Sequence, residues 1–363
     1  MSGTSMDAID TALVRFNHNS LELIAYQQFP FEEAIRQPVR ELTMASPQAE
    51  IEKYHAILGD LFAGAVRKII SQAGISRNDV SAIGSHGQTI GHLPDAVPPR
   101  TLQIGDAALI ARHTGITTVA DFRRMDMEAG GQGAPLAPAL HANLFRSAEF
   151  NRCILNLGGI ANITVLPADV DRTVTGFDTG PGNGLLDDWN RLHNHTNMDT
   201  DSHWAMQGTP ISALLDNMLM DAYFGRPFPK STGRDYFNLQ WLQHRLGELA
   251  VQANPADVQA TLLQLTVTSI ADAIKKQPVV ISELYLCGGG MHNPALVRGL
   301  GEQLPGLTIA STQQLGLDPD AVEAVTFAWL AKRRLEGKPG NLPSVTGARE
   351  AVLLGTIYEP GKQ

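Results

Sequence analysis

Two stretches of this chain combine a turn of small residues with strand-like segments, and one lies in each half of the sequence. The first is residues 1–10, which lead into the alternating segment 11–16. The second is residues 153–166, a strand, a Gly-Gly turn and a second strand. Glycine-containing turns present backbone N–H groups that bind phosphate. The pair predicts two phosphate-binding hairpins that face one cleft, although a plain hairpin turn is the alternative for the first.

The first hairpin carries both donors and carboxylates. Gly3, Thr4 and Ser5 supply candidate N–H and hydroxyl donors for a phosphate, and Asp7 or Asp10 is placed to face a cation.

A glycine-rich stretch at residues 176–183 contains a single carboxylate, Asp178. A carboxylate beside an anion-binding turn acts as a base when it is positioned against a hydroxyl or a water molecule. The alternative is an Asx-type turn at Asp178 that caps a helix beginning near Leu185. The other glycine motifs favour Asp178 as the candidate catalytic residue.

Composition narrows the class of protein. The chain has 363 residues, of which 43% are hydrophobic and 18% charged, which predicts a folded α/β enzyme rather than a disordered chain. Its formal net charge of -9 argues against a nucleic-acid surface. The only cysteines, Cys153 and Cys287, lie in apolar segments and are expected to be reduced thiols. With neither a signal peptide nor a long apolar segment, we expect a cytoplasmic protein without a membrane partner.

A second group of polar residues follows a strand in the first half of the chain. Apolar residues at three-to-four spacing predict a long helix at 49–73, and a strand at 80–84 follows it. Ser85, His86 and Gln88 come directly after this strand, where ligands commonly bind. Metal binding by His86 and His92 is a weaker alternative, because no carboxylate or cysteine completes a recognisable ligand set.

A further strand, at 117–120, ends in the charged segment 121–126. The guanidinium groups of Arg123 and Arg124 are candidates to hold a carboxylate or phosphate. The alternative is a surface network of ion pairs with Asp121 and Asp126. The glycines of 130–133 then predict a crossing between domains.

The last third of the chain supplies a candidate nucleotide segment. A strand at 279–286 runs into Gly288, Gly289 and Gly290, and only glycine lets a base or phosphate approach the backbone so closely. A helix predicted at 320–335 carries Glu323, which is either a helix-start charge or a site residue. Lys230 and Arg234 are either phosphate contacts or solvated charges.

Taken in order, these motifs resemble the sugar kinase/Hsp70/actin superfamily and, within it, the anhydro-N-acetylmuramic acid kinase family. The resemblance runs almost end to end and rests on MSGTSMDAID, GSHGQT, ADFRRMDMEAGGQGAPLAP, LNLGGIANIT, GFDTGPGN and LCGGGMHNPAL. It implies ATP-dependent phosphorylation of 1,6-anhydro-N-acetylmuramic acid with opening of the 1,6-bridge, in cell-wall recycling. It implies ATP and Mg²⁺ as cofactors, with the metal held through ATP and water and by Asp7 as the candidate protein ligand.

The same resemblance assigns roles to residues. Asp178 falls on the catalytic base and also contacts the sugar. The expected ATP-binding residues are Gly3, Thr4, Ser5, Met6, Asp7, Ala8, Ile9, Asp10, Gly158, Gly159, Gly288, Gly289 and Gly290. The expected sugar-binding residues are Ser85, His86, Gln88, Asp121, Arg123, Arg124 and Glu323.

The fold expected from the resemblance is a two-lobed, actin-like ATPase (ribonuclease H-like) α/β fold with the active site in the cleft. We expect residues 1–130 and 340–363 in the first lobe, residues 131–339 in the second, and a homodimer. Two departures from the family stand at the first hairpin. The strand that usually precedes it is not in the sequence, so we expect an arm of the hairpin to be missing, and Ala8 replaces a glycine.

Three other functions are open to such a chain. They are a sugar sensor without catalysis, an Hsp70-like interaction module and an ordinary hexose kinase. Asp178 and the segment 120–126 favour the anhydro-sugar kinase, because a sensor needs no base and a chaperone needs no sugar pocket.

Overall fold

The computed structural model describes residues 1–3, 6–17, 20–249 and 253–361. It is a mixed α/β fold with two compact units, so the predicted α/β class and the division into two parts are confirmed. Unit 1 comprises Met1–Leu140 with Ala321–Gln363, and unit 2 comprises His141–Asp320. These boundaries differ from the expected ones, because residues 131–140 and 321–339 belong to unit 1.

The strands of unit 1 form three small sheets in the described part of the chain. Two are antiparallel pairs, β1 with β2 and β4 with β5, and the third has the order β12-β6-β3. The strands are β1 (Ala8–Asn17), β2 (Ser20–Pro30), β3 (Ile83–Gly84), β4 (Gln88–Leu93), β5 (Arg100–Ile104), β6 (Thr118–Ala120) and β12 (Thr356–Tyr358).

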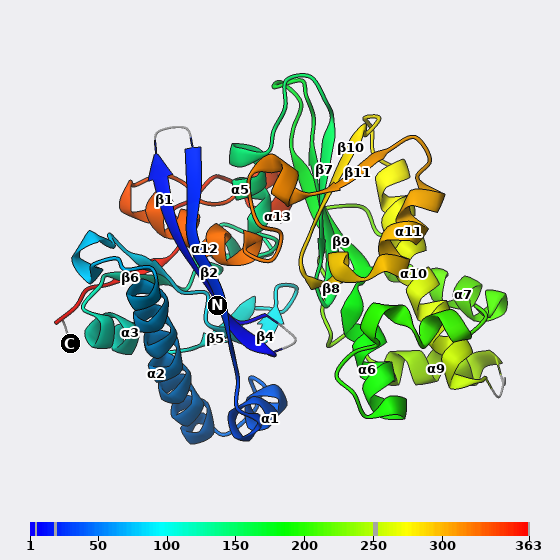
Figure 1. Cartoon of the computed structure of the whole chain (residues 1–363), viewed down its shortest axis with the longest axis horizontal. Helices are drawn as coiled ribbons and strands as arrows, with labels where there is room; N and C mark the ends of the chain where they lie inside the picture. The colour runs from blue at the N-terminus through cyan, green and yellow to red at the C-terminus, as the bar shows by residue number, and fades with distance from the viewer. Residues whose placement is uncertain (4–5, 18–19, 250–252, 362–363) are drawn as a thin grey trace. The chain divides into compact units, whose positions relative to one another are not determined.

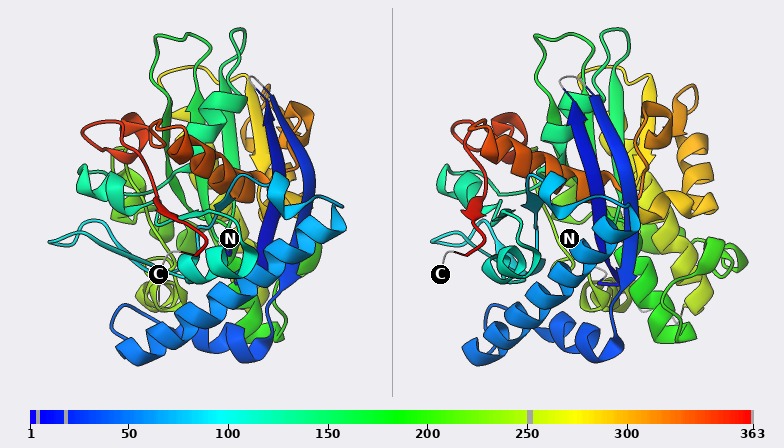
Figure 2. Two further views of the ribbon diagram at one scale, coloured as in Figure 1. Left: turned by 90° about the vertical axis from the view of Figure 1, so that its left-hand side faces the viewer. Right: turned by 60° about the vertical axis from the view of Figure 1, so that its left-hand side comes forward.

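Helix α2 (Gln48–Gln72) is the long helix predicted from the spacing of apolar residues, and it lies against β1 and β2 (Figure 2). It buries Ile51, Leu58 and Phe62 in the core of unit 1, and Ile69 in a smaller hydrophobic cluster beside it. The other helices of unit 1 are α1 (Glu33–Glu41), α3 (Ala107–Thr114), α4 (Arg124–Glu128), α5 (Ala137–Leu144, whose last residues belong to unit 2), α12 (Val322–Leu335) and α13 (Pro343–Thr346).

Helix α12 belongs to unit 1 because it packs directly on β1, β3 and β6. A Cβ added at Gly84 would lie 2.0 Å from the carbonyl oxygen of Phe327, so glycine is required for this approach. The sequence pattern shows a helix of small residues here but does not show which sheet it covers.

Residues 1–3 lie beside β1. Met1 and Asp10 exchange two backbone hydrogen bonds of 2.8 Å, one in each direction. A cavity of about 640 Å³ extends from Met1 along β1, with α2, residues 79–85 and α12 as its other walls. Ala8 begins β1, and the left-handed backbone conformation falls on Met6 instead, with φ of 54°. The absence of glycine at position 8 therefore causes no strain.

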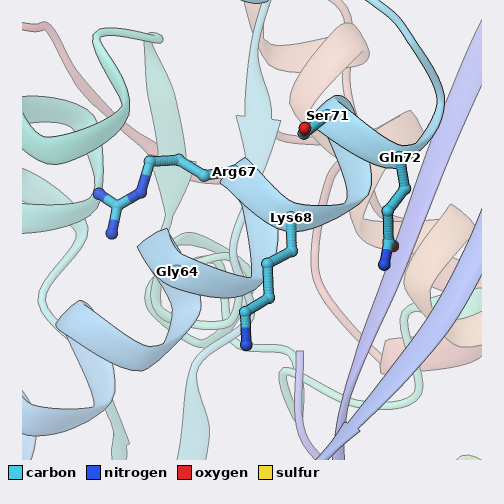
Figure 3. Close-up of a pocket in the computed structure, with 5 residues that line it drawn as sticks. All are labelled: Gly64, Arg67, Lys68, Ser71 and Gln72. Atoms are coloured by element: carbon cyan, nitrogen blue, oxygen red, sulfur yellow. The ribbon is translucent and has the colours of Figure 1, made fainter.

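A second, shallower cavity of about 330 Å³ lies on the surface of α2 (Figure 3). It is lined by residues from consecutive turns of that helix, namely Gly64, Arg67, Lys68, Ser71 and Gln72. None of the predicted site residues lines it.

Unit 2 is built on one five-stranded sheet of order β11-β10-β7-β8-β9. The first three of these strands are parallel, and β8 is antiparallel to both of its neighbours, β7 and β9. The strands are β7 (Arg152–Leu157), β8 (Ile160–Leu166), β9 (Thr175–Pro181), β10 (Glu283–Cys287) and β11 (Thr308–Ser311).

Helices α10 and α11 pack together beside this sheet (Figure 1). Asn254 caps α10 as the sequence predicts, and Ile270 and Leu300 join Ile163, Phe177 and Leu284 in the core. The helices of unit 2 are α6 (Asn183–Asn194), α7 (Ser212–Leu219), α8 (Ala222–Gly225), α9 (Leu239–Leu249), α10 (Pro255–Lys275) and α11 (Pro294–Gln303).

Candidate active site

Asp178 lies in strand β9, where it pairs with Asn162 of β8. The sequence predicted a turn at residues 176–183, and this prediction is wrong. A strand that contains two glycines and ends in a proline is tolerated here because β9 is at the edge of its sheet. The alternative helix cap is also excluded, because Gly182 is the N-cap of α6 and no side chain caps that helix.

One segment of unit 2 holds Asp178 at three points. The backbone N–H of Asp178 donates to the carbonyl oxygen of Lys230 at 3.2 Å, and the hydroxyl of Tyr223 donates to the carbonyl oxygen of Asp178 at 2.6 Å. The backbone N–H of Thr232 donates to Oδ2 of the Asp178 carboxylate at 2.9 Å. An N–H donor favours the charged carboxylate, the form that accepts a proton.

The side chain of Lys230 is folded back onto this same region. Its Nζ lies 4.6 Å from the ring centroid of Tyr223 and 5.7 Å from that of Phe177, and it donates to the carbonyl oxygen of Tyr223 at 3.1 Å. Arg234 forms an ion pair with Asp188 at 2.5 Å. Neither residue is therefore simply a solvated charge.

The second hairpin joins the strand of Asp178 through its turn. The carbonyl oxygens of Gly158 and Gly159 accept from the backbone N–H groups of Asn183 and Gly182, at 2.8 and 3.0 Å. A Cβ at Gly182 would lie 2.3 Å from the carbonyl oxygen of Gly158. Glycine is required at position 182 because two backbone segments approach each other closely there.

The three glycines after β10 have different environments. Gly288 has φ of 77°, and a Cβ there would lie 2.3 Å from Oδ1 of Asn156. A Cβ at Gly290 would lie 2.6 Å from Nδ2 of Asn183. At Gly289 nothing lies within 4 Å of the added Cβ. Packing within the protein thus explains Gly288 and Gly290, whereas Gly289 faces open space.

In unit 1 the structure brings His86 and Arg123 together. Nε and Nη2 of Arg123 lie 3.1 and 2.9 Å from Nε2 of His86, and Nη1 donates to the carbonyl oxygen of Gly133 at 2.8 Å. Burial, and then the nearby charge of Arg123, lower the pKa of His86 well below its usual value. The imidazole is therefore neutral, with Nε2 accepting from Arg123 and Nδ1 donating to the carbonyl oxygen of Gly87.

Exposed Arg124 and half-buried Asp121 form an ion pair at 2.6 Å, which is one of the ion pairs given as the alternative in the sequence analysis. Burial raises the pKa of Asp121 despite this partner. Asp126 does not join that network. It is buried and accepts from Gly133 N–H at 2.8 Å, and from Asn341 and Thr346 at 2.6 and 2.7 Å.

Glu323 is accessible to solvent yet crowded by protein atoms. Loss of hydration, and then the negative charge of Asp10, raise the pKa of Glu323, while Arg123 opposes the shift. Ser85 and Gln88 are buried. The N–H of Ser85 donates to the carbonyl oxygen of Val119, and the side chain of Gln88 accepts from the hydroxyl of Ser2.

The first hairpin is described only in part, because Thr4 and Ser5 lie outside the described residues. Gly3 accepts a hydrogen bond from Met6 N–H at 3.1 Å. The side chains of Met6 and Ile9 are buried in the core of unit 1. The carboxylate of Asp7 is exposed and forms an ion pair with Arg36 at 3.3 Å, while Asp10 accepts from Tyr26 and Gln28 at 2.7 and 2.9 Å.

The structure gives no support to the metal alternative. Within residues 1–3, 6–17, 20–249 and 253–361, no group of three or more His, Cys, Asp or Glu side chains is arranged to hold a metal ion. His92 instead places Nδ1 3.0 Å from the hydroxyl of Thr101. In the same described ranges, no helix combines the length and apolar character needed to cross a membrane.

Sequence reasoning missed Tyr223 and Thr232 altogether and left Lys230 undecided. Tyr223 and Thr232 are 45 and 54 residues from Asp178 in the chain, so no local spacing connects them to it. The turn-forming segment around Pro229 and Gly233 was the one available signal.

Comparison with known proteins identifies the family. The model of the anhydro-N-acetylmuramic acid kinase family matches residues 1–360. A protein of that name from Xanthomonas campestris pv. campestris is 48% identical over 364 residues, which cover 99% of this chain and 96% of the relative. Another of that name from Xylella fastidiosa is 49% identical and covers 99% of this chain and 94% of the relative.

A solved structure, the activator of the 2-hydroxyisocaproyl-CoA dehydratase from Clostridium difficile, matches with a TM-score of 0.40 at 11% identity. It covers 91% of this chain and 98% of that chain. The sequence matches cover nearly the whole chain, at an identity well above what chance similarity gives. The chain therefore belongs to the anhydro-N-acetylmuramic acid kinase family.

Proposed function

We propose that this chain uses ATP to phosphorylate 1,6-anhydro-N-acetylmuramic acid and opens its 1,6-bridge with water. The products are N-acetylmuramic acid 6-phosphate and ADP, and the reaction serves the recycling of cell-wall peptidoglycan. The observation that carries this proposal is the match over nearly the whole chain to proteins named for this kinase activity.

Asp178 is the proposed catalytic base. O6 of the anhydro-sugar is bonded to C1, so the sugar has no free 6-hydroxyl to deprotonate. Asp178 takes a proton from water, the water oxygen bonds to C1, and the bond from C1 to O6 breaks. O6 then bonds to the γ-phosphorus, ADP leaves, and Asp178 releases its proton to solvent. The Thr232 N–H on Oδ2 supports this role because it stabilises the carboxylate.

ATP is proposed to bind through the two hairpins and the segment after β10. Backbone N–H groups at glycine turns stabilise phosphate charge during transfer. The open space at Gly289 supports contact with the nucleotide at that position. The full proposed set is Gly3, Thr4, Ser5, Met6, Asp7, Ala8, Ile9, Asp10, Gly158, Gly159, Gly288, Gly289 and Gly290.

Mg²⁺ is proposed to accompany ATP. Its preferred ligands are phosphate oxygens, water and one or two carboxylates, and the exposed carboxylate of Asp7 fits that donor set. When bound, Mg²⁺ neutralises charge on the phosphates. Activity that persists after complete chelation of divalent cations would contradict this requirement.

Besides Asp178, further residues are proposed to contact the sugar. Arg123 or Arg124 is the proposed partner of its lactyl carboxylate, since a guanidinium binds a carboxylate through two parallel hydrogen bonds. The other proposed contacts are Ser85, His86, Gln88, Asp121 and Glu323. We also propose a cytoplasmic homodimer without a nucleic-acid partner, which sedimentation and a nucleic-acid binding assay test directly.

Two measurements test the function. ADP release is compared among anhydro-N-acetylmuramic acid, N-acetylglucosamine and glucose, and only the first is expected to support turnover. The reaction is then run in ¹⁸O-labelled water, and the label is expected at C1 of the product. Label in the phosphate ester, or a product with an intact bridge, would contradict the mechanism and favour an ordinary hexose kinase.

The variant Asp178→Asn tests the proposed role of Asp178 as the catalytic base. It is expected to fold, to bind ATP and to turn over at least about a hundredfold more slowly, because removal of a positioned base commonly costs on the order of 10²–10⁴ in rate.

A further inference from the structure

The segment that holds Asp178 is itself held by the side chain of Lys230. The Nζ of Lys230 lies over the rings of Tyr223 and Phe177 and donates to the carbonyl oxygens of Tyr223 and Phe224, at 3.1 and 3.5 Å. These contacts connect the strand of Asp178, through Phe177, with the helix of Tyr223. Lys230 therefore bridges the two parts of the protein that fix Asp178.

We propose that Lys230 is a positioning residue that aims the Asp178 carboxylate by clamping residues 223–232 against strand β9. This inference rests on the proposed role of Asp178 as the base. Lys230 itself contacts no reacting atom.

The main chain of residues 230–232, which belong to the clamped segment, forms hydrogen bonds with Asp178. Lys230 accepts from Asp178 N–H at 3.2 Å, and two residues later Thr232 N–H donates to the carboxylate at 2.9 Å. A shift of residues 230–232 therefore rotates or frees the carboxylate. Misplacement of a reacting group by about 1 Å can cost on the order of a hundredfold in rate.

The strength of the clamp depends on the charge of Lys230, because only a cation is attracted to the faces of two aromatic rings. Burial lowers the pKa of Lys230 to about 8, the positive charges of Lys276 and Arg226 add to this, and Asp178 opposes it. Burial, and then Asp178, raise the pKa of Tyr223, so its hydroxyl keeps its proton over the same range. Lys230 is thus the group of the clamp that titrates near pH 8.

Activity and stability are expected to respond to pH in opposite directions. Between about pH 8 and the ordinary lysine value of 10.5, the folded protein binds fewer protons at Lys230 than the unfolded chain does. The contribution of Lys230 to stability therefore rises with pH in this window. Loss of the cation in the same window releases the clamp and lowers kcat. A purely structural lysine would not give this divergence.

The test compares wild type with Lys230→Met, Lys230→Arg and Lys276→Met, from about pH 6 to about pH 10. Wild-type kcat is expected to fall above about pH 8. Lys230→Met should lower kcat at neutral pH by about ten- to a hundredfold, leave the KM for ATP unchanged and remove the alkaline fall. Lys230→Arg should keep most of the activity and move the fall beyond the measured range, because a guanidinium stays charged.

Lys276→Met is the control that removes a neighbouring charge but leaves the clamp. It should keep kcat at neutral pH and move the alkaline fall to slightly higher pH, since Lys276 lowers the pKa of Lys230. NMR of the wild type with ¹³Cε-labelled lysine supplies a readout that is independent of catalysis. One lysine signal, missing from Lys230→Arg, should titrate near pH 8.

Three results would each overturn the proposal. They are a kcat of Lys230→Met equal to that of the wild type, a fall in kcat that persists at about pH 8 in Lys230→Arg, and a Lys230 NMR signal that titrates at the ordinary lysine value. If Lys230→Met fails to fold, the arginine variant and the NMR titration still decide the question. If the wild type does not phosphorylate the anhydro-sugar, the proposed function fails instead. A dead Asp178→Asn beside an unaffected Lys230→Met rejects the clamp alone.

Discussion

The hydroxyl of Tyr223 donates a 2.6 Å hydrogen bond to the main-chain oxygen of Asp178, across 45 residues of sequence. Both residues are buried in unit 2. The bond fixes the backbone from which the proposed base projects, and the ring of Tyr223 also faces Nζ of Lys230. These two roles can be separated, because the hydroxyl serves one and the ring serves the other.

Tyr223→Phe removes the hydroxyl and keeps the ring. We expect kcat to fall by about fivefold, which corresponds to the loss of one hydrogen bond worth about 1 kcal/mol. The alkaline fall in kcat assigned to Lys230 should persist, since the ring remains. Steady-state kinetics of wild type and variant at several pH values decide this, and an unchanged kcat contradicts it.

Arg123→Ala and Arg124→Ala test the binding of the sugar carboxylate. Arg123 is fixed by His86 and Gly133, whereas Arg124 is exposed in an ion pair with Asp121. A pre-oriented guanidinium binds a carboxylate more strongly. We therefore expect the KM for the sugar to rise about tenfold or more in Arg123→Ala and less in Arg124→Ala, while the KM for ATP barely changes.

The two single variants control for each other, because each removes one guanidinium and leaves its neighbour. A sugar KM that stays at the wild-type value in both would place the lactyl carboxylate elsewhere.

Gly289→Ala probes the nucleotide segment without disturbing the fold. Nothing lies within 4 Å of the added Cβ, so the thermal stability should stay at the wild-type value. If ATP approaches the backbone there, the methyl group should raise the KM for ATP several-fold. Gly288→Ala is the matched contrast, because its φ of 77° and the 2.3 Å approach to Asn156 should destabilise unit 2 itself. An unchanged KM for ATP in Gly289→Ala would show that the nucleotide lies elsewhere.

His141 should make unit 2 sensitive to acid. It is buried, its Nδ1 lies 2.9 Å from the hydroxyl of Thr164, and burial lowers its pKa to about 3. Between that value and the ordinary 6.5, the unfolded chain binds more protons at this residue, so stability falls as the pH falls. The slope for one proton approaches about 1.4 kcal/mol per pH unit.

The comparison is between wild type and His141→Gln, by denaturant unfolding from about pH 7 to about pH 4.5. The difference in unfolding free energy between the two proteins should shrink, or change sign, as the medium becomes acidic. A difference that stays constant with pH would mean that His141 does not carry this dependence.

Local patterns predict the local elements of this fold. The spacing of apolar residues predicts a helix at 49–73, and α2 is Gln48–Gln72. The pair Asn254 and Pro255 predicts the start of α10 at Pro255. The Gly-Gly turn predicts the hairpin formed by β7 and β8. In each case neighbours in the chain determine the structure.

Relations between distant residues escape such patterns. Glycine and proline around Asp178 indicate a turn, but the position of β9 at the sheet edge allows a strand, and strand order is a property of the whole unit. The assignment of α12 to unit 1 likewise depends on its contact with Gly84, far away in the sequence. The contacts of Asp178 with Tyr223 and Thr232 could not be predicted from local patterns for the same reason.

The contacts of the buried Asp126 carboxylate can form only in a certain order while the chain is being synthesised. Its partners Asn341 and Thr346 follow it by 215 and 220 residues, and all of unit 2 is synthesised in between. On the ribosome, unit 2 is therefore available as one continuous sequence before unit 1 receives its final residues. The hydrogen bonds that Asn341 and Thr346 donate to Asp126 can form only after the C-terminal segment emerges. The buried carboxylate of the arginine segment thus gains two of its hydrogen-bond donors only at the end of synthesis.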